Sequence, residues 1–372
     1  MSARVQRRVA HLLCRALEFL LPPRMRDWGL AIRYELEEIP DDTQALSFAL
    51  ASVCGLAPRA IGLRLMQPFV ALLGADPRAV GALCASGAVA LGLVYMTLAG
   101  APARYLGINA GALVLGLILL ALVSRIPVEV RRLSGALIFG LSVILLATAL
   151  AGLRVEGAAR WVRLGGVVVQ PSLVLLPLML AGFSRTRTPL ATAGIVIAAL
   201  AMALQPDRAM AAMMTATLAT LVAARADRLT SMAFTASLLA FVVTLLRPDA
   251  LPAVPFVDQV FFSSFSVHAL AGLAVVAGSV MLLVPVMLAG SCDEDSRATW
   301  LAFGSAWLAA ILAAALGNYP TPVVGYGGSA ILGYVLSLST LPRPVNSQAR
   351  AATASPDESP ASRDLHSKIA LA

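Results

Sequence analysis

Residues 157–172 read GAARWVRLGGVVVQPS and form a polar stretch between two apolar segments. Arg160 and Arg163 flank Trp161, and Pro171 opens the next apolar run. Proline suits the first turn of a helix, where its missing N–H costs nothing. Tryptophan is an amphipathic ring that favours the headgroup layer of a membrane. The residue types alone therefore predict an interfacial loop that anchors two membrane helices.

The composition around this stretch is that of a membrane protein. The 372 residues are 59% hydrophobic and only 13% charged, with a mean hydropathy of +0.83. Repeated apolar runs of this kind predict a polytopic all-α membrane protein. The net charge of +8 is expected to set orientation and to meet anionic lipid, so we expect no nucleic-acid partner. The four cysteines and three histidines are scattered, which predicts neither a disulfide framework nor a metal cluster.

About ten membrane-spanning helices are expected between the two ends of the chain. The predicted spans are 79–100, 105–124, 133–152, 170–184, 189–204, 208–223, 229–246, 261–290, 298–316 and 328–341. Loops on one side carry Arg125, Arg131, Arg132, Arg185, Arg187, Arg225 and Arg228, which predicts that this side and both termini are cytoplasmic. The outer loop at 153–169 is an exception, because it carries three arginines. His268 falls inside the eighth predicted span and is a candidate functional residue on that ground.

The two ends have different compositions from the middle. We expect residues 1–76 to form amphipathic helices that are cytoplasmic or lie at the membrane interface. In residues 4–21, leucines fall on one face and arginines on the other, which favours a helix lying on the membrane surface. Asp41 is expected to cap a further helix, with Gln44 as its capping-box partner. Residues 61–74 are expected to be interfacial. We expect residues 342–372 to form a disordered cytoplasmic tail. Residues 77–341 are expected to form the membrane domain.

Three motifs carry a resemblance to a known family. The first is the opening stretch, with Gly157, Arg160, Trp161 and Gly165 followed by Gln-Pro-Ser at 170–172. The second is Gln-Pro-Asp at 205–207, and the third is PVVGYGGS at 322–329. In this order they resemble the SEDS family, the FtsW/RodA/SpoVE proteins. The resemblance covers roughly residues 79–341 and does not extend to either end.

The resemblance implies a function. SEDS proteins are multi-pass proteins of the bacterial inner membrane that act in cell division and cell shape. The implied activity is that of a peptidoglycan glycosyltransferase polymerising lipid II, an undecaprenyl-linked disaccharide. A membrane transpeptidase (a penicillin-binding protein) is the implied protein partner, and a divalent cation, Mg²⁺ or Mn²⁺, is the one cofactor considered.

The family has an essential aspartate that follows a proline-rich outer loop and directly precedes an aromatic-rich helix. Asp258 matches that position, before Phe261 and Phe262, so the resemblance makes it the catalytic candidate. A helix N-cap would explain an aspartate here equally well. The substrate-binding candidates are Arg160, Trp161, Arg163, Gln170, Ser172, Asp207, Arg208, Tyr326, Gly327, Gly328 and Ser329.

Each candidate also has a structural interpretation. The arginines, including Arg247, suit pyrophosphate oxygens or ordinary lipid phosphates. Asp207 suits a helix N-terminus. The glycine turn at 325–329 could line a lipid groove or only permit close helix packing.

The sequence departs from the family pattern in ways that favour a second hypothesis. The family has Gln-Pro-Ser-Glu-x-x-Lys, whereas Leu173 and Leu176 replace both charged residues here. Ala209 and Met210 stand where the family has Gly-Thr, and the segment between Asp207 and Asp258 is shorter. Joint loss of a buried ion pair is compatible with an intact fold. A non-catalytic protein that binds, regulates or transports a lipid precursor is therefore the alternative to the enzyme.

Overall fold

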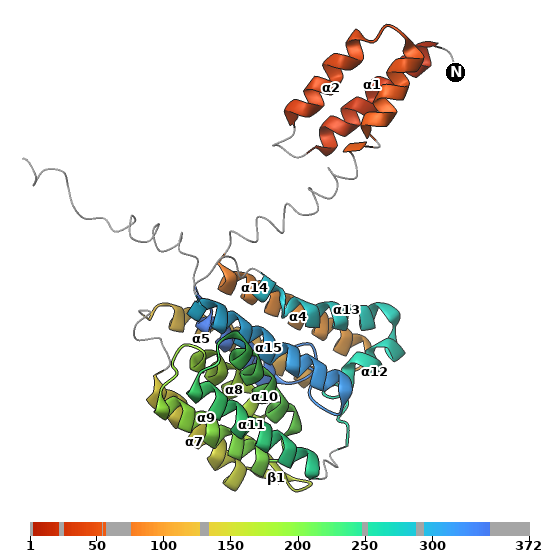
Figure 1. Cartoon of the computed structure of the whole chain (residues 1–372). Helices are drawn as coiled ribbons and strands as arrows, with labels where there is room; N and C mark the ends of the chain where they lie inside the picture. The colour runs from red at the N-terminus through yellow and green to blue at the C-terminus, as the bar shows by residue number, and fades with distance from the viewer. Residues whose placement is uncertain are drawn as a thin grey trace, which may run out of the picture. The chain divides into compact units, whose positions relative to one another are not determined.

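A computed structural model describes residues 3–21, 26–53, 55–56, 76–126, 134–247, 252–287 and 294–342. The chain divides into two compact units, Met1–Ala75 and Asp76–Ala372, drawn in Figure 1. Each unit is described by itself. The predicted interfacial segment 61–74 and nearly all of the predicted tail 342–372 lie outside the described residues.

The N-terminal unit is a small helical assembly with its own apolar core. Helix α1 spans Ala3–Leu20, helix α2 spans Arg26–Glu38, and residues 42–53 are also helical. The buried core is formed by Ala10, Cys14, Leu17, Leu21, Ile32, Leu36, Ala45 and Ala49. Of the apolar stripe of α1 that we expected on a membrane surface, Leu17 is buried in this unit and Leu13 packs against its core, whereas Val5 and Leu12 are exposed. The buried side chains lie inside because all three helices are amphipathic and bury one another's apolar faces.

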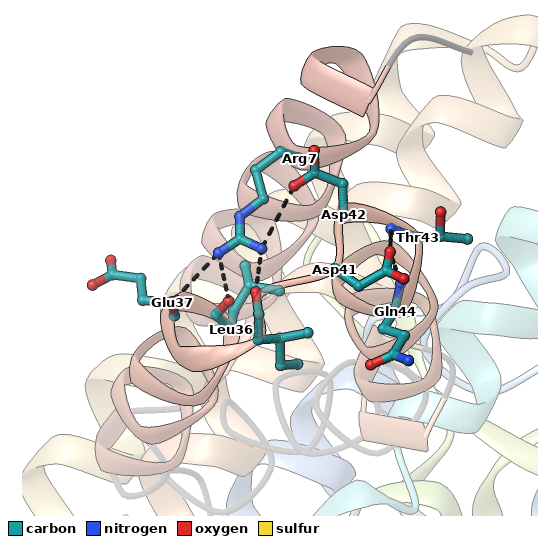
Figure 2. A network of polar contacts seen from close by, with 8 residues as sticks. Arg7, Leu36, Glu37, Asp41, Asp42, Thr43 and Gln44 are labelled. Atoms are coloured by element: carbon teal, nitrogen blue, oxygen red, sulfur yellow. Dashed lines mark hydrogen bonds and ion pairs between the residues drawn. The ribbon is translucent and has the colours of Figure 1, made fainter.

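Arg7 also turns inward from the polar face of α1. Its guanidinium group donates hydrogen bonds to the backbone carbonyls of Leu36, at 3.2 Å, and of Glu37, at 3.3 Å (Figure 2). It also donates to the carbonyl of Ile39 and lies 3.7 Å from the carboxylate of Asp42. A cation on the last carbonyls of a helix satisfies groups that the helix itself cannot pair. Arg7 therefore joins α1 to the end of α2.

The third helix of this unit begins as predicted. The Asp41 carboxylate accepts hydrogen bonds from the backbone N–H groups of Thr43, at 2.7 Å, and of Gln44, at 3.4 Å (Figure 2). These are the bonds of an N-cap residue.

The membrane unit is a helical bundle with apolar helices along its whole length. Its elements are α4 (Pro77–Leu98), α5 (Ala103–Ser124), α7 (Gly135–Ala151), β1 (Leu153–Val155), β2 (Ala158–Leu164), β3 (Val167–Val169), α8 (Pro171–Phe183), α9 (Pro189–Leu204), α10 (Arg208–Ala224), α11 (Arg228–Leu246), α12 (Val260–Val267), α13 (Ala269–Met281), α14 (Val284–Met287), α15 (Glu294–Leu316), α16 (Gly328–Ser337) and the 3₁₀ turn Leu338–Thr340. Among the described helices, four are long and apolar enough to cross a membrane: Pro77–Leu98, Ala103–Ser124, Arg228–Leu246 and Ser296–Leu316. Six shorter apolar helices correspond to the remaining predicted spans.

Five of these helices begin at a capping side chain that the sequence places between apolar runs. Asp76, Ser134, Thr188, Asp207 and Asp227 each accept a hydrogen bond from a backbone N–H in the first turn that follows. Such bonds satisfy N–H groups that have no partner inside the helix. The polar residues between apolar runs therefore define the helix starts.

Buried aromatic side chains connect α15 and α16 in the core of the bundle. Trp307 packs edge-on against Tyr334 with ring centroids 5.1 Å apart, and its indole N–H donates to Ser337 Oγ at 3.1 Å. The Tyr334 hydroxyl donates to the carbonyl of Leu282 at 2.9 Å. Helix α15 packs on α8 and α10, α16 packs on α5 and α8, and α4 packs on α13. Figure 1 shows α7, α9 and α11 on one side of this unit and α4 and α13 on the other.

Two segments differ from the expected helix-and-loop pattern. The eighth predicted span is broken into α12, α13 and α14. His268 lies at the first break, where it is exposed and its Nδ1 accepts from the backbone N–H of Leu270 at 3.1 Å. His268 is therefore a helix cap and not a buried polar group inside a span.

The second difference is the polar stretch at 153–169, which forms a three-stranded antiparallel sheet in the order β1-β2-β3. Two-residue turns join the strands. Glu156 and Gly157 both have positive φ in the first turn, and Gly165 has positive φ in the second. Tight hairpins require such angles, which glycine adopts without strain.

Candidate functional site

A cavity of about 560 Å³ is lined by the three-stranded sheet, by the starts of α8 and α10, and by two loops. The sheet contributes Leu153, Arg154, Val155, Arg160, Trp161, Arg163 and Val168. The helix starts contribute Gln170, Leu173, Asp207, Ala209 and Met210, and the loops contribute Pro252, Val254, Val257, Asp258, Asn318, Tyr319 and Pro320. Two carboxylates and three guanidinium groups thus meet in one mainly apolar cavity. This combination is typical of a ligand site.

Asp207 is at the centre of a buried polar network at the cavity wall. Its Oδ1 accepts from the backbone N–H of Met210 at 3.2 Å and so caps α10. Its Oδ2 accepts from Gln170 Nε2 at 2.9 Å and from the Ser172 hydroxyl at 3.3 Å. The backbone N–H of Gln170 donates to Ser329 Oγ at 2.9 Å. One network therefore joins residues from all three sequence motifs.

Arg160 connects the sheet to the second motif. This side chain is only 4% exposed. Its guanidinium donates to the carbonyl of Pro206 and, at 3.4 Å, to the carbonyl of Gln205. The Gln205 side chain in turn donates to the carbonyl of Leu145 in α7 at 3.1 Å. Arg160 holds the turn before Asp207 in place, whereas Arg154 and Arg163 are exposed where they line the cavity.

Asp258 lies at the cavity wall in the loop before α12. Its Oδ2 accepts from the backbone N–H of Val254 at 2.9 Å. Helix α12 begins after Gln259, which has a left-handed backbone conformation, and no side chain caps it. Gln259 is the N-cap residue of α12, so Asp258 lies one position before the cap, where its bond to Val254 holds the loop.

The segment with the glycine-rich third motif is hydrogen-bonded to the loop that carries Asp258. The backbone N–H of Tyr326 donates to the carbonyl of Phe256 at 2.6 Å, and that of Thr321 donates to the carbonyl of Val257 at 2.9 Å. A Cβ at Gly325 would lie 3.1 Å from the Phe256 carbonyl oxygen and 2.9 Å from that of Thr321. Only glycine allows so close an approach. Of the two roles expected for the glycine turn, close packing is the one its contacts show.

Asn109 fixes this turn from α5. It is fully buried, and its amide donates to the carbonyl of Gly325 at 2.9 Å and accepts from the backbone N–H of Gly327 at 3.1 Å. Next to it, the rings of Tyr105 and Tyr326 stack with centroids 3.8 Å apart. Burial raises the pKa of the Tyr326 phenol, so this ring stays neutral at physiological pH.

Comparison with known proteins gives a family match for part of the chain and similar solved structures. The family model of the FtsW/RodA/SpoVE cell cycle proteins matches residues 88–256, which include the first two motifs. The solved structure of the rod shape determining protein RodA from Thermus thermophilus is similar, with 20% sequence identity and a TM-score of 0.50. That match covers 69% of this chain and 92% of RodA.

Residues 88–256 of the chain thus match the SEDS family.

The chain is a polytopic all-α membrane protein with a RodA-like fold, and its matched segment resembles the cell cycle proteins of that family. A solved aspartate-to-alanine mutant of the same Thermus protein is also similar, with 21% identity over 69% of this chain and 93% of that one, and a TM-score of 0.49. No curated protein matches the chain by sequence. The matched segment ends two residues before Asp258, so the match does not include that residue.

The two leucines that replace the charged pair of SEDS proteins are both buried. Leu173 lines the cavity and is 5% exposed, and Leu176 is fully buried one helical turn further into the bundle. A charge at either position alone would be buried without its partner, which is costly. The apolar pair therefore leaves a well-packed helix α8 and an apolar patch in the cavity wall.

Not every predicted site residue reaches the cavity. Arg208 donates to the carbonyls of Thr244 and Arg247 at the end of α11, and Arg247 donates to the carbonyl of Ala203 at the end of α9. Both side chains thus pair helix ends, as cations at helix C-termini do. Four other predicted residues do not line the cavity: Tyr326, Gly327, Gly328 and Ser329.

Sequence reasoning missed two residues of the site. Arg154 was noted only as a loop charge, yet it lines the cavity beside Arg163. Asn109 was not considered at all. An asparagine inside an otherwise apolar span is the signal that could have found it, because such groups need a partner inside the protein.

Proposed function

We propose that this protein is a peptidoglycan glycosyltransferase that polymerises lipid II, with Asp258 as its general base. The observation that carries the proposal is the position of Asp258 in one cavity with Trp161, Arg154 and Arg163. A carboxylate, an aromatic ring and two exposed guanidinium groups suit a ligand that has both sugar and pyrophosphate parts.

In the proposed reaction, the hydroxyl oxygen of the acceptor sugar attacks the anomeric carbon of the donor. Asp258 accepts the proton of that hydroxyl, and the bond between the anomeric carbon and the pyrophosphate oxygen breaks. Undecaprenyl pyrophosphate leaves with the bonding electrons. Arg154 and Arg163 stabilise the charge that develops on it, because guanidinium groups pair bidentately with phosphate oxygens. Arg160 acts indirectly by holding the Asp207 turn.

A divalent cation fits the same wall. Mg²⁺ commonly takes one or two protein carboxylates and completes its shell with substrate phosphates and water. Asp258 is the carboxylate that would hold Mg²⁺ or Mn²⁺ here, and it would then be a metal ligand in place of the base. In the described part of the chain no group of three or more metal-ligating side chains gathers, so the remaining ligands would come from phosphate and water. Such an ion would supply charge neutralisation at the leaving pyrophosphate.

The second candidate function is a non-catalytic protein that keeps the lipid-binding cavity. The observation that favours it is the apolar wall at Leu173, where SEDS proteins have a charged residue. Such a protein would bind, regulate or transport a lipid-linked precursor in the inner membrane. A transpeptidase partner fits either candidate.

The two functions differ in what purified wild-type protein does with lipid II. Full-length protein in detergent, with and without candidate transpeptidases, is mixed with lipid II, and glycan chains are resolved by gel electrophoresis. Binding is measured in parallel by native mass spectrometry. Glycan polymerisation supports the enzyme. Binding without polymerisation with every partner supports the non-catalytic function, and absence of both contradicts the shared cavity assignment.

A further inference from the structure

The outward face of α1 carries large apolar side chains that the folded N-terminal unit does not bury. Val5, Leu12 and Phe19 follow one another at seven-residue intervals. Seven residues are close to two helical turns, so the three side chains lie on one side of the helix. They are 43%, 64% and 78% exposed, whereas the core of the unit uses the other side of α1, around Cys14.

Two outward arginines border this apolar stripe. Arg8 and Arg15 are also seven residues apart, and both side chains are exposed. Within the described part of the chain neither of them is in an ion pair. The alkyl stem of an arginine can lie along apolar surface while its guanidinium group stays in a polar layer. A helix face that combines leucine and phenylalanine with arginine is typical of a helix bound in the headgroup region of a membrane.

The neighbouring charges of α1 are already used inside the unit. Glu18 is the one acid of α1, and its carboxylate lies 3.1 Å from Arg33 of α2. Arg7 turns inward to the carbonyls at the end of α2. Glu18 therefore does not cancel the charge of Arg8 and Arg15, and the outward face of α1 is positive.

The outward face of α2 has the opposite charge. Glu35, Glu37 and Glu38 are exposed there, next to the exposed ring of Tyr34. The two helices pack against each other in the unit (Figure 1), so its basic and acidic outward side chains are on different helices. An anionic surface attracts the α1 face and repels the α2 face. Charge thus selects one orientation of the unit at such a surface.

A second copy of the chain and a separate acidic protein are the other occupants that would suit this stripe. The bilayer is favoured because the chain continues from this unit into Pro77–Leu98, a helix long and apolar enough to cross a membrane. Covalent attachment to such a helix keeps the α1 face at a high effective concentration of lipid headgroups. No second protein has to be supplied for the apolar side chains to be covered.

We infer that Val5, Leu12 and Phe19, together with Arg8 and Arg15, bind the surface of an anionic bilayer. The apolar side chains enter the boundary between headgroups and acyl chains, and the arginines contact lipid phosphates. Each arginine strengthens binding to an anionic leaflet by roughly fivefold, so the pair contributes roughly thirtyfold. The unit docks in its folded form, with its core intact. The inference does not depend on the proposed glycosyltransferase activity.

The test measures side-chain exposure in full-length protein by hydroxyl-radical footprinting and mass spectrometry. The protein is placed in nanodiscs of phosphatidylcholine alone or of phosphatidylcholine mixed with phosphatidylglycerol, with one chain or two chains per disc. The oxidation rates of Leu12 and Phe19 report on the α1 face. Tyr34, which is 70% exposed on α2, is the internal reference.

The test variant is Arg8→Gln with Arg15→Gln. The matched control is Arg125→Gln with Arg228→Gln, which removes the same charge from exposed positions of the membrane unit. All four side chains are exposed, so neither change disturbs a packed core.

In wild type, Leu12 and Phe19 are expected to be oxidised roughly threefold or more slowly in anionic discs than in neutral discs. Tyr34 is expected to react at the same rate in both. The test variant should lose the protection of Leu12, and the matched control should keep it. High salt should also weaken the protection, because it screens the attraction between arginine and headgroup.

Equal oxidation of Leu12 in neutral and anionic discs would overturn the inference. A test variant that keeps the protection, or a matched control that loses it, would do the same. Protection in both lipids that appears only in discs with two chains would assign the face to a second copy instead. If the test variant does not fold, the comparison of the two lipids in wild type, with Tyr34 as reference, still decides the question.

Discussion

At the scale of single residues, Asp258 shows how the loop, and not the helix, positions the candidate base. Its carboxylate is held by the N–H of Val254, four residues earlier, and the loop itself is held by the backbone of Thr321 and Tyr326. The sequence could place an aspartate near a helix start, but capping preferences could not distinguish a cap from a loop residue. The left-handed Gln259 that separates Asp258 from α12 was not predictable either.

Asn109 gives the residue-scale prediction. Asn109→Leu keeps the side-chain size but leaves the Gly325 carbonyl and the Gly327 N–H buried without their partner. We expect a loss of roughly 2 kcal/mol or more in stability. Faster hydrogen exchange is expected across 318–327, where the turn supports the Asp258 loop.

The control for Asn109 is Thr97→Val in full-length protein. The Thr97 hydroxyl is exposed and donates to the carbonyl of Leu93 within its own helix, so little change in exchange or melting temperature is expected. Equal protection at 318–327 in wild type and Asn109→Leu would contradict the assigned role.

At the scale of secondary-structure elements, the spacing of apolar residues predicted most helices but not which helices pack against one another. Residues 4–21 were predicted correctly as a helix, but the buried face of α1 includes Cys14, which was not predicted, and Leu12 of the predicted stripe is exposed. Periodicity reports which face is apolar but not what covers it. The sheet at 153–169 escaped prediction because its strands of three to seven residues are too short for a clear alternating pattern.

Arg7 gives the element-scale prediction. Arg7→Gln removes the guanidinium that joins α1 to the carbonyls at the end of α2. We expect the N-terminal unit to lose about 1–3 kcal/mol of stability, seen as faster hydrogen exchange in α1 and α2 of the full-length protein. Arg8→Gln, an exposed neighbour, is the matched control and should exchange as wild type does in detergent, without a bilayer. Unchanged hydrogen-exchange protection in Arg7→Gln would show that the packing of Leu36 and its neighbours holds α1 and α2 together without the Arg7 hydrogen bonds.

At the scale of the whole molecule, arginine placement and the number of spans predict the orientation. The hairpin at Glu156 is expected in the periplasm, and Ala226, Ala352 and both termini are expected in the cytoplasm. Single cysteines at these three positions, in a chain whose four native cysteines are replaced, are exposed to a membrane-impermeant maleimide. Glu156→Cys should react in intact cells with a permeable outer membrane, and the other two only after lysis. Labelling of Glu156→Cys and Ala226→Cys from the same side would contradict the architecture.

Much of the site was predictable because three short motifs carry it. Trp161, Gln170 and Asp207 were expected together, and the cavity and its polar network unite them. Arg208 was expected there too, but it caps α11. An arginine beside a motif looks the same in sequence whether it faces a ligand or a helix end, so only packing could separate the two roles.

The central claim, that Asp258 acts as a base in the cavity, is tested most directly by polymerisation of lipid II. Purified wild type, Asp258→Asn and the matched control Glu156→Gln are compared at equal protein amounts. Glu156 lies on the hairpin turn between β1 and β2 and is exposed outside the cavity lining. Because asparagine keeps the side-chain size but accepts no proton, we predict normal abundance and a loss of roughly 100-fold or more in glycan synthesis. Glu156→Gln should remain as active as wild type. An Asp258→Asn protein that polymerises lipid II at the wild-type rate would contradict the account.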